Sequence, residues 1–245
     1  MAPLAVFTSL SIAAVLAAAP QPRQPVQVIP AEAPGMPPSD AIVLFDGKDV
    51  SRWRTKDGRP TGCRAGQGAM VCPTGAGSAY STAEFGDAQI HLEYNIPPMP
   101  DHNGQLRGNS GVYLHGRYEV QILDGWDNPT YAMGVVGALY GTAPPLVNAS
   151  RRPSEWQTYD IVFRSPKCFE DQLVKPGSVT VLLNGVLVQD HVSLIHPADA
   201  CSSGRIPEKG PLMLQDHSGF PNAPHTEMRF RNIWLRPLDG NDVAP

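Results

Sequence analysis

Alternation of apolar and polar positions dominates the chain from residue 41 onward and predicts half-buried β-strands. The pattern is clearest at residues 89–94, where Ile90, Leu92 and Tyr94 share one parity. No stretch of three or more helical turns has the helical period. Further strands are predicted at residues 110–115, 157–164, 178–190, 212–216 and 226–237.

In two places the sequence also predicts how a strand turns or bends. Asn184–Gly185 separates two apolar runs, which is the strongest short signal for a two-residue hairpin. Between residues 226 and 237, the apolar positions 228 and 230 have one parity, whereas 233 and 235 have the other. A bulge near Arg231 and Asn232 would bring all four to one face of the strand.

Many short strands joined by long polar loops predict two packed sheets. We therefore expect an all-β fold, a two-sheet antiparallel jelly-roll sandwich. A chain of 245 residues is long enough for one large domain of this kind. The predicted loops at 97–109, 125–136, 141–155 and 196–210 exceed what a hairpin needs, and such loops are usually functional or tethered by disulfides.

The first 40 residues differ in composition from the rest. Residues 1–19 contain an Ala-rich apolar run that is too short for a comfortable membrane span and ends in small residues. We interpret them as a signal peptide, although no Lys or Arg precedes the run; a buried helix is the alternative. Residues 20–40 hold seven prolines and predict an extended linker. The folded domain is then expected at residues 41–240.

Composition narrows the range of partners. Lys and Arg number 19 against 23 Asp and Glu, with no basic run, so nucleic acid and anionic membrane surfaces are poor partners. After removal of the signal peptide no segment is expected to span a membrane, and nothing indicates an oligomeric state. Localisation is expected to be periplasmic or extracellular.

Cysteine usage agrees with export. Of the four cysteines, none forms a paired C-x-x-C, which disfavours a zinc site. Two disulfides are expected in an oxidising compartment. Cys63 and Cys72 flank a Gly-rich turn and could pair across a hairpin, leaving Cys168 and Cys201 to close a long loop. The two other pairings stay open.

Strand parity places a set of polar side chains opposite the core. Val120 and Ile122 have the core parity, so Glu119 and Gln121 share the other face. A solvated sheet face would look similar at any one position, but amides, imidazoles and aromatic rings together suit a sugar, whose hydroxyls and C–H patches they can bind. The same parity adds Asn109, Tyr113, His115, Gln215 and His217.

The same strand does not carry the paired carboxylates of an ordinary glycosidase. Asp124 lies five positions from Glu119, an odd number, so the two face opposite ways on a regular strand. We expect Asp124 to end the strand and cap the following turn. Glu93 could supply a second carboxylate only if its strand lies beside this one.

Several motifs in a fixed order resemble one bacterial family, the 3-keto-disaccharide hydrolase domain, over about residues 42–238. Individually the motifs are weak, but the ordered set is specific. The family is similar in fold to concanavalin-like lectins and glucanases, in agreement with the strand pattern. The motifs are LFDGKDVSRW, GNSGVYLHGRYEVQILD, GALYG, EWQTYDI, LNGVLV, GPLMLQDH and MRFRNIWLRPL.

The resemblance implies cleavage of glycosides whose sugar carries a 3-ketone. Such a ketone acidifies the C2 proton, so a base can remove it, the C1 substituent is expelled, and water then adds. This chemistry needs a base, a donor to the enolate oxygen and an acid. Glu119 or His217 is expected as the base, with the other as the acid. The expected substrate-binding residues are Asn109, Tyr113, His115, Gln121 and Gln215.

Two points stay open in the sequence. His and carboxylate side chains could also ligate a divalent metal, but no cofactor is certain, because their spacing specifies no site. A non-catalytic, lectin-like carbohydrate-binding module is the main alternative function, since this type of fold hosts both classes. A structural or surface interaction domain is a third.

Overall fold

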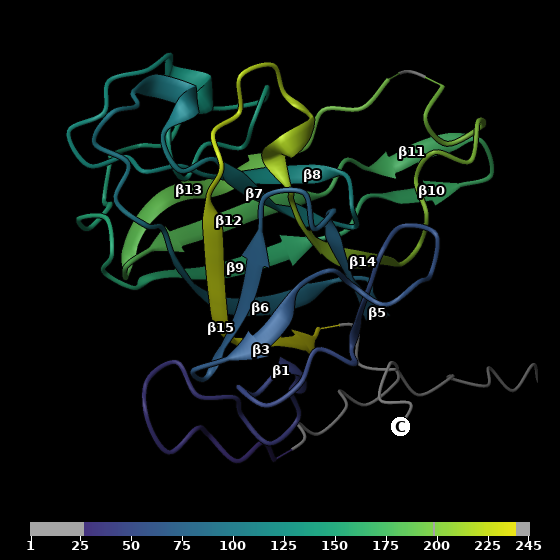
Figure 1. Ribbon diagram of the computed structural model, residues 1–245. Coiled ribbons are helices and arrows are strands. Elements are labelled where there is room, and N and C mark those ends of the chain that lie inside the picture. Colours follow the sequence, from purple (N-terminus) through teal and green to yellow (C-terminus); the bar gives the residue numbers. More distant parts are fainter. Residues whose placement is uncertain (1–26, 198, 239–245) are drawn as a thin grey trace, which may run out of the picture.

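The computed structural model describes residues 27–197 and 199–238, and the predicted signal peptide lies outside them (Figure 1). Within the described residues the only helices are three short 3-10 turns, η1 (Gly104–Leu106), η2 (Ala132–Gly134) and η3 (His217–Gly219). All other regular elements are strands. They are β1 (Ile42–Phe45), β2 (Trp53–Arg54), β3 (Arg64–Gly66), β4 (Ala69–Pro73), β5 (Ala79–Phe85), β6 (Ala88–Asn95), β7 (Ser110–Leu114), β8 (Tyr118–Ile122), β9 (Gln157–Arg164), β10 (Lys167–Phe169), β11 (Gln172–Lys175), β12 (Ser178–Leu183), β13 (Val186–Ser193), β14 (Gly210–Leu214) and β15 (Glu227–Pro237).

The strands form two main antiparallel sheets in a sandwich-like arrangement. The larger sheet has the order β13-β12-β9-β6-β15-β4-β3, with β1 also paired to β15, and the smaller one has the order β2-β5-β14-β7-β8. A separate hairpin joins β10 to β11. The predicted all-β, antiparallel architecture is confirmed.

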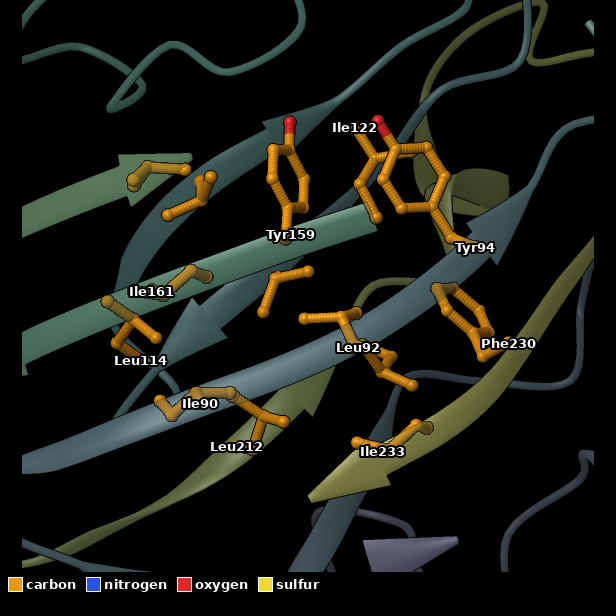
Figure 2. Packing of buried hydrophobic residues seen from close by; sticks show 14 of the residues in the cluster. Ile90, Leu92, Tyr94, Leu114, Ile122, Tyr159, Ile161, Leu212, Phe230 and Ile233 are labelled. Carbon is orange, nitrogen blue, oxygen red and sulfur yellow. The ribbon is translucent and has the colours of Figure 1, made fainter. Parts of the chain in front are cut away.

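The core lies between the sheets, where the predicted apolar parities meet (Figure 2). Leu92 of β6 is opposite Tyr159 of β9, and the side chains of both are fully buried. Each large side chain buried in this way contributes roughly 1.5–3 kcal/mol through removal of apolar surface from water. The Tyr159 hydroxyl donates to the backbone oxygen of Gln121 at 2.6 Å, so the core directly holds the strand that carries the polar residues.

Both predicted irregularities are present. Asn184 and Gly185 join β12 to β13 with positive φ angles of 53° and 80°, as a type I′ turn requires. In β15 the register with β6 shifts between Arg231 and Trp234, and Asn232 has a φ of 48°. The bulge places the apolar residues on both sides of it in the core.

The two expected disulfides are Cys63–Cys72 and Cys168–Cys201. The first joins two residues nine positions apart, and Cys72 lies in β4. The second, with a separation of 33 residues, ties the β10–β11 hairpin to the loop that precedes β14. In the chain-entropy picture, closing a loop of this second length stabilises the fold by about 3–4 kcal/mol.

The end of the predicted linker packs against the larger sheet. The carbonyl of Gly35 accepts hydrogen bonds from Asn232 Nδ2 at 2.7 Å and from Trp234 Nε1 at 2.8 Å. Trp234 in turn stacks on His91, with ring centroids 5.2 Å apart. Residues near Gly35 therefore cover the outer face of β6 and β15. Over the described part of the chain, none of the helices has the length and apolar character needed to cross a membrane.

Candidate active site

The polar residues predicted from parity centre on the β7–β8 hairpin of the smaller sheet. Tyr113 in β7 lies directly opposite Glu119 in β8, and on its other side Tyr113 is opposite Met213 in β14. Tyr113 and Glu119 point away from the core and are hydrogen-bonded to each other. Side chains directly opposite on an antiparallel pair are close enough to act together.

Gly111 makes room for the Glu119 carboxylate. A Cβ at Gly111 would lie 2.3 Å from Glu119 Oε1 and 2.9 Å from the Tyr113 ring. Both distances are shorter than atoms tolerate, so any side chain at this position would displace the carboxylate. The glycine in the motif N-S-G-V-Y is therefore required by the side chains beside it rather than by its backbone conformation.

Gln121 and Asn109 lie behind Glu119. With its amide in the swapped orientation, Gln121 donates to Glu119 Oε1 at 3.1 Å and to the Ser110 backbone oxygen at 3.1 Å. Asn109 donates to the Gln105 backbone oxygen at 3.0 Å and to Gln105 Oε1 at 3.1 Å. Gln105 itself donates to the backbone oxygen of Gly134 at 2.9 Å. Gln121 therefore holds the carboxylate from its buried side, while Gln105 joins η1 to η2 and to Asn109.

Gln215, the residue after β14 ends, positions Tyr113 from the other side. Its Nε2 donates to the Tyr113 hydroxyl at 3.0 Å, and its backbone nitrogen donates to the Gly111 carbonyl at 2.9 Å. Tyr113 thus accepts from Gln215 and donates to Glu119. The three side chains form one directed chain of hydrogen bonds, from Gln215 just after β14 through β7 to β8.

Burial sets the protonation of this group. It raises the pKa of Glu119 from 4.5 to about 7, and the hydrogen bond from Tyr113 opposes part of that rise. Burial and the neighbouring Glu119 carboxylate raise the pKa of Tyr113 well above its usual value. Glu119 can therefore exchange a proton near neutral pH while Tyr113 stays a neutral donor. A carboxylate with a pKa near the working pH is suited to general base catalysis.

Glu119 and Tyr113 form part of the floor of an open cleft of about 300 Å³. One wall comes from the segment after η2, and the other from the loop between β13 and β14. Figure 1 shows the teal loops with η1 and η2 at the upper left and the β10–β11 hairpin at the right, on the side of the second wall. The residues around the cleft are Tyr113, Arg117, Tyr118, Glu119, Leu139, Tyr140, Thr142, Ile195, His196, Pro197, Ala200 and Ile206.

His217 lies in a different cavity from Glu119. It begins η3 and stacks flat on Phe220, with ring centroids 4.0 Å apart, and burial lowers its pKa. With Asn109 and Gln215 it lines a cavity of about 20 Å³, which holds no more than a water molecule or so. The structure therefore does not bring His217 into the cleft with Glu119. The two regions are connected through the Gln215–Tyr113 hydrogen bond.

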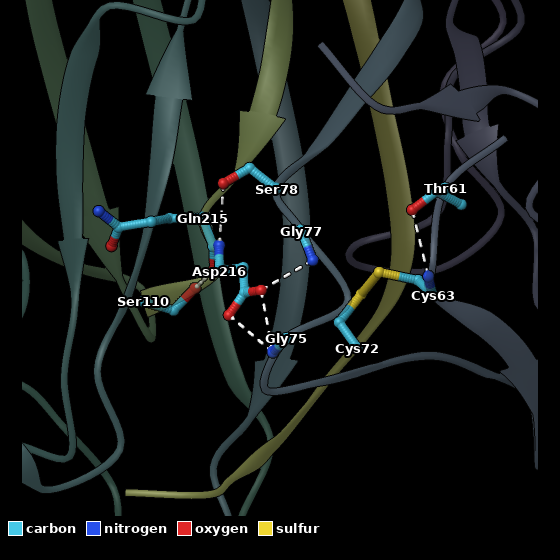
Figure 3. Close-up of a disulfide and its surroundings, with 9 residues drawn as sticks. All are labelled: Thr61, Cys63, Cys72, Gly75, Gly77, Ser78, Ser110, Gln215 and Asp216. Carbon is cyan, nitrogen blue, oxygen red and sulfur yellow. Dashed lines mark hydrogen bonds between the residues drawn. A yellow bond between two sulfur atoms is a disulfide. The ribbon is translucent and has the colours of Figure 1, made fainter. Parts of the chain in front are cut away.

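Asp216 holds the backbone around His217 in place. Its carboxylate accepts from the backbone nitrogens of Gly75 at 3.0 Å and Gly77 at 2.7 Å, next to the Cys63–Cys72 disulfide (Figure 3). It also accepts from the Ser218 nitrogen at 3.0 Å. The conformation of η3 is thus fixed by the disulfide-bonded hairpin region.

The parity prediction for His115 is wrong. β7 ends at Leu114, and His115 has a φ of 55° in the turn to β8, so the outward and inward alternation stops before it. Its ring packs against Phe163 at 4.7 Å and Phe85 at 5.1 Å. Burial lowers its pKa to about 4. His115 is therefore a neutral residue packed against the core and does not line the cleft.

Glu119 is the one carboxylate among the described residues that line the cleft. Asp124 is buried, forms an ion pair with Arg107 at 2.9 Å and accepts from the Trp126 backbone nitrogen at 3.1 Å, which confirms its predicted capping role. Glu93 lies on β6 in the other sheet, where it pairs with Arg231, so its strand is not a neighbour of β8. A two-carboxylate glycosidase site is not formed on this sheet.

Two residues of this region were not predicted from the sequence. Gln105 lies in η1, outside the cleft lining, where no strand parity guides an assignment. Tyr140 is part of the GALYG motif, and its backbone nitrogen donates to the Glu119 carbonyl at 2.9 Å. Over residues 27–197 and 199–238, no three His, Cys, Asp or Glu side chains gather closely enough to hold a metal ion. These residues therefore offer no candidate set of ligands for a divalent metal.

Comparison with known proteins gives the class first. A solved Parabacteroides distasonis structure, provisionally described as a glycosyl hydrolase, is 37% identical over 89% of this chain and 93% of its own, with a TM-score of 0.78. Two further P. distasonis structures with the same description are each 19% identical, cover 82% and 81% of this chain and 94% and 99% of their own, and have TM-scores of 0.59 and 0.54. Fold and sequence thus group this protein with glycosyl hydrolase-like, carbohydrate-active proteins.

The family can be named as well. The chain belongs to the 3-keto-alpha-glucoside-1,2-lyase-like domain family, whose model matches residues 40–236. The family resemblance inferred from the sequence motifs is confirmed. No curated protein matches the chain.

Proposed function

We propose that this protein cleaves the glycosidic bond of 3-keto-glucosides, with Glu119 as the base that removes the C2 proton. The observation that carries the proposal is a single carboxylate, with a pKa near 7, held at the floor of a cleft by hydrogen bonds from Tyr113 and Gln121. The family to which the chain belongs supports the same chemistry by its description as lyase-like. This reaction needs no second carboxylate.

In the first step the Glu119 carboxylate takes the proton from C2. The electron pair of the C2–H bond moves to the C2–C3 bond, and the negative charge develops on the oxygen of the 3-ketone. Tyr113, a neutral donor beside Glu119, can turn its hydrogen bond from the now protonated carboxyl to that oxygen. Gln215 donates to the Tyr113 hydroxyl oxygen and so helps Tyr113 to stabilise the negative charge on the oxygen of the 3-ketone.

In the second step the enolate expels the C1 substituent. A double bond forms between C1 and C2, the C1–O bond breaks, and the departing oxygen takes up a proton. In an α-glucoside the C2–H and C1–O bonds point to opposite faces of the ring, so the acid must lie across the substrate from Glu119. His217 as this acid stays a prediction, because it lines the neighbouring cavity. Addition of water would complete net hydrolysis: the water oxygen bonds to C1, Glu119 returns its proton to C2, and the proton released by the water restores the acid.

The test compares a methyl 3-keto-α-glucoside with the unoxidised methyl α-glucoside. The wild type should consume the first and leave the second intact, because only the ketone acidifies C2. Glu119→Gln keeps the size of the side chain but not the base, and should lower turnover by at least about 100-fold. Equal cleavage of the unoxidised glucoside would contradict the proposed chemistry. Full activity of Glu119→Gln would contradict the assignment of the base.

A lectin-like module would bind such sugars without turnover, so the same assay separates the two functions. We also infer export to the periplasm or beyond the cell. The two disulfides support this inference, since such bonds persist mainly in oxidising compartments. Mass spectrometry of the mature protein from its native host tests it, and an intact N-terminus at Met1 would contradict it.

A further inference from the structure

Two exposed tyrosines stand beside the cleft. Tyr131 and Tyr140 have exposed fractions of 51% and 45%, unusual for large aromatic side chains. Their hydroxyls are 2.7 Å apart and their ring centroids 6.4 Å apart at an interplanar angle of 73°. Tyr140 lines the cleft, whereas Tyr131 lies outside its lining. The pair therefore extends from the interior of the cleft past its edge.

Both rings are attached to the framework that holds Glu119. The Tyr140 backbone nitrogen donates to the Glu119 carbonyl. The Tyr131 ring lies against Gly134, where an added Cβ would come within 2.5 Å of two of its ring carbons. Gly134 in turn accepts from Gln105, which accepts from Asn109, the residue just before β7. An exposed ring that is fixed in this way has little conformational entropy to lose when it binds a ligand.

The size of the cleft indicates what the pair would contact. A volume of about 300 Å³ is at the lower limit for ligand pockets and suits a single sugar ring. The group bonded to C1 of a sugar whose C2 faces Glu119 must then extend beyond the cleft. Tyr131 offers an aromatic surface there, and sugars and aryl groups both pack on aromatic faces through C–H or ring contacts.

We propose that Tyr131 and Tyr140 form the subsite for the leaving group of the substrate, either a second sugar or an aryl group. The inference rests on the proposed 3-keto-glucoside cleavage. It assigns the preference for substrate size to the segment between β8 and β9, on the side of the cleft opposite the loop tied by Cys168–Cys201. Substrates with a bulky neutral leaving group gain binding energy from the pair, whereas a methyl group is too small to reach Tyr131.

The test measures KM and kcat for phenyl and methyl 3-keto-α-glucosides with the wild type and four variants. Tyr131→Ala and Gly134→Ala should each raise KM for the phenyl substrate by about 3–10-fold, the equivalent of one aromatic contact. For Tyr131→Ala, KM for the methyl substrate should stay within about 2-fold. Gly134→Ala keeps the Tyr131 side chain but displaces its ring. It therefore shows whether the position of the ring matters, in addition to its presence. Tyr131→Phe keeps the ring and should retain most of the preference for the phenyl substrate.

Phe169→Ala is the matched control, because it removes an exposed aromatic ring of β10 outside the cleft lining. It should leave KM unchanged for both substrates. Unchanged KM values for Tyr131→Ala, or equal rises for both substrates, would overturn the subsite while leaving the proposed function in place. If the wild type cleaves neither ketone, both proposals fall. Melting temperatures of all variants show whether Gly134→Ala remains folded. If it does not, the KM values of Tyr131→Ala alone test the proposed subsite.

Discussion

At the scale of single residues, the chemistry depends on the environment of Glu119. Burial raises its pKa to about 7, and Tyr113 supplies the hydrogen bond that keeps it from rising further. Parity alone correctly placed Glu119 and Tyr113 on one outward face, because strict alternation holds inside a regular strand. It failed for His115, one residue beyond the end of β7, where a left-handed turn replaces the strand. Strand parity could not indicate Gln105, because it lies in the 3-10 turn η1 and not in a strand.

The pH dependence of turnover tests this environment. Only the deprotonated carboxylate can act as the base, so kcat/KM for a 3-keto-glucoside should rise with pH and level off above a pKa of about 7. Tyr113→Phe removes the hydrogen bond that favours the charged form, and its inflection should move to higher pH. Gln215→Leu, which removes the donor to Tyr113 but leaves Tyr113 in place, is the matched variant and should move the inflection less. An inflection unaffected by Tyr113→Phe would contradict the account.

The same burial costs stability. A carboxyl whose pKa is raised from 4.5 to about 7 binds its proton more tightly in the folded state, so folding stability falls as pH rises through this window. Glu119→Gln removes the buried charge and should raise the free energy of unfolding at pH 8 by about 1–3 kcal/mol, with little change at pH 4. Denaturant unfolding at the two pH values measures this. If Glu119→Gln instead lowered the free energy of unfolding at pH 8, the Glu119 carboxylate would be well solvated in the folded protein.

At the scale of elements, the β7–β8 hairpin depends on Gly111. Gly111→Ala should abolish most turnover and lower the melting temperature, because its Cβ would overlap the Glu119 carboxylate. Gly66→Ala is the matched control: Gly66 is also a strand residue, and its Cβ would meet only a Val71 methyl at 3.9 Å. The control should keep wild-type turnover. Equal activities of the two variants would show that the carboxylate can move without loss.

Two bends of the chain were predictable from the sequence. The hairpin at Asn184–Gly185 and the bulge at Asn232 both follow from local rules, since positive φ angles and two-residue side-chain periods depend on neighbours in sequence. The relation of β6 to β8 could not be obtained in this way. Which strands are neighbours depends on packing over the whole chain, and only the structure shows that Glu93 and Glu119 lie in different sheets. The particular jelly-roll connection stays a prediction.

At the scale of the whole molecule, the two disulfides have different relations to the cleft. Cys168–Cys201 ties the loop that forms one cleft wall to the β10–β11 hairpin, whereas Cys63–Cys72 borders the smaller cavity. Replacing Cys168 and Cys201 together by Ser should raise KM for a 3-keto-glucoside several-fold, since the wall must then be ordered on binding. Replacing Cys63 and Cys72 should lower the melting temperature with a smaller change in KM. The reverse order of KM effects would contradict this division.

The central claim is removal of the C2 proton by Glu119, and an isotope experiment tests it most directly. A methyl 3-keto-α-glucoside carrying deuterium at C2 should be consumed more slowly than its protium counterpart in single-turnover reactions, because the C2–H bond breaks in the first step. Glu119→Gln should consume both substrates much more slowly than the wild type does. Identical rates for the two isotopologues, with no exchange of C2 hydrogen with solvent, would contradict elimination through C2 and with it the role assigned to Glu119.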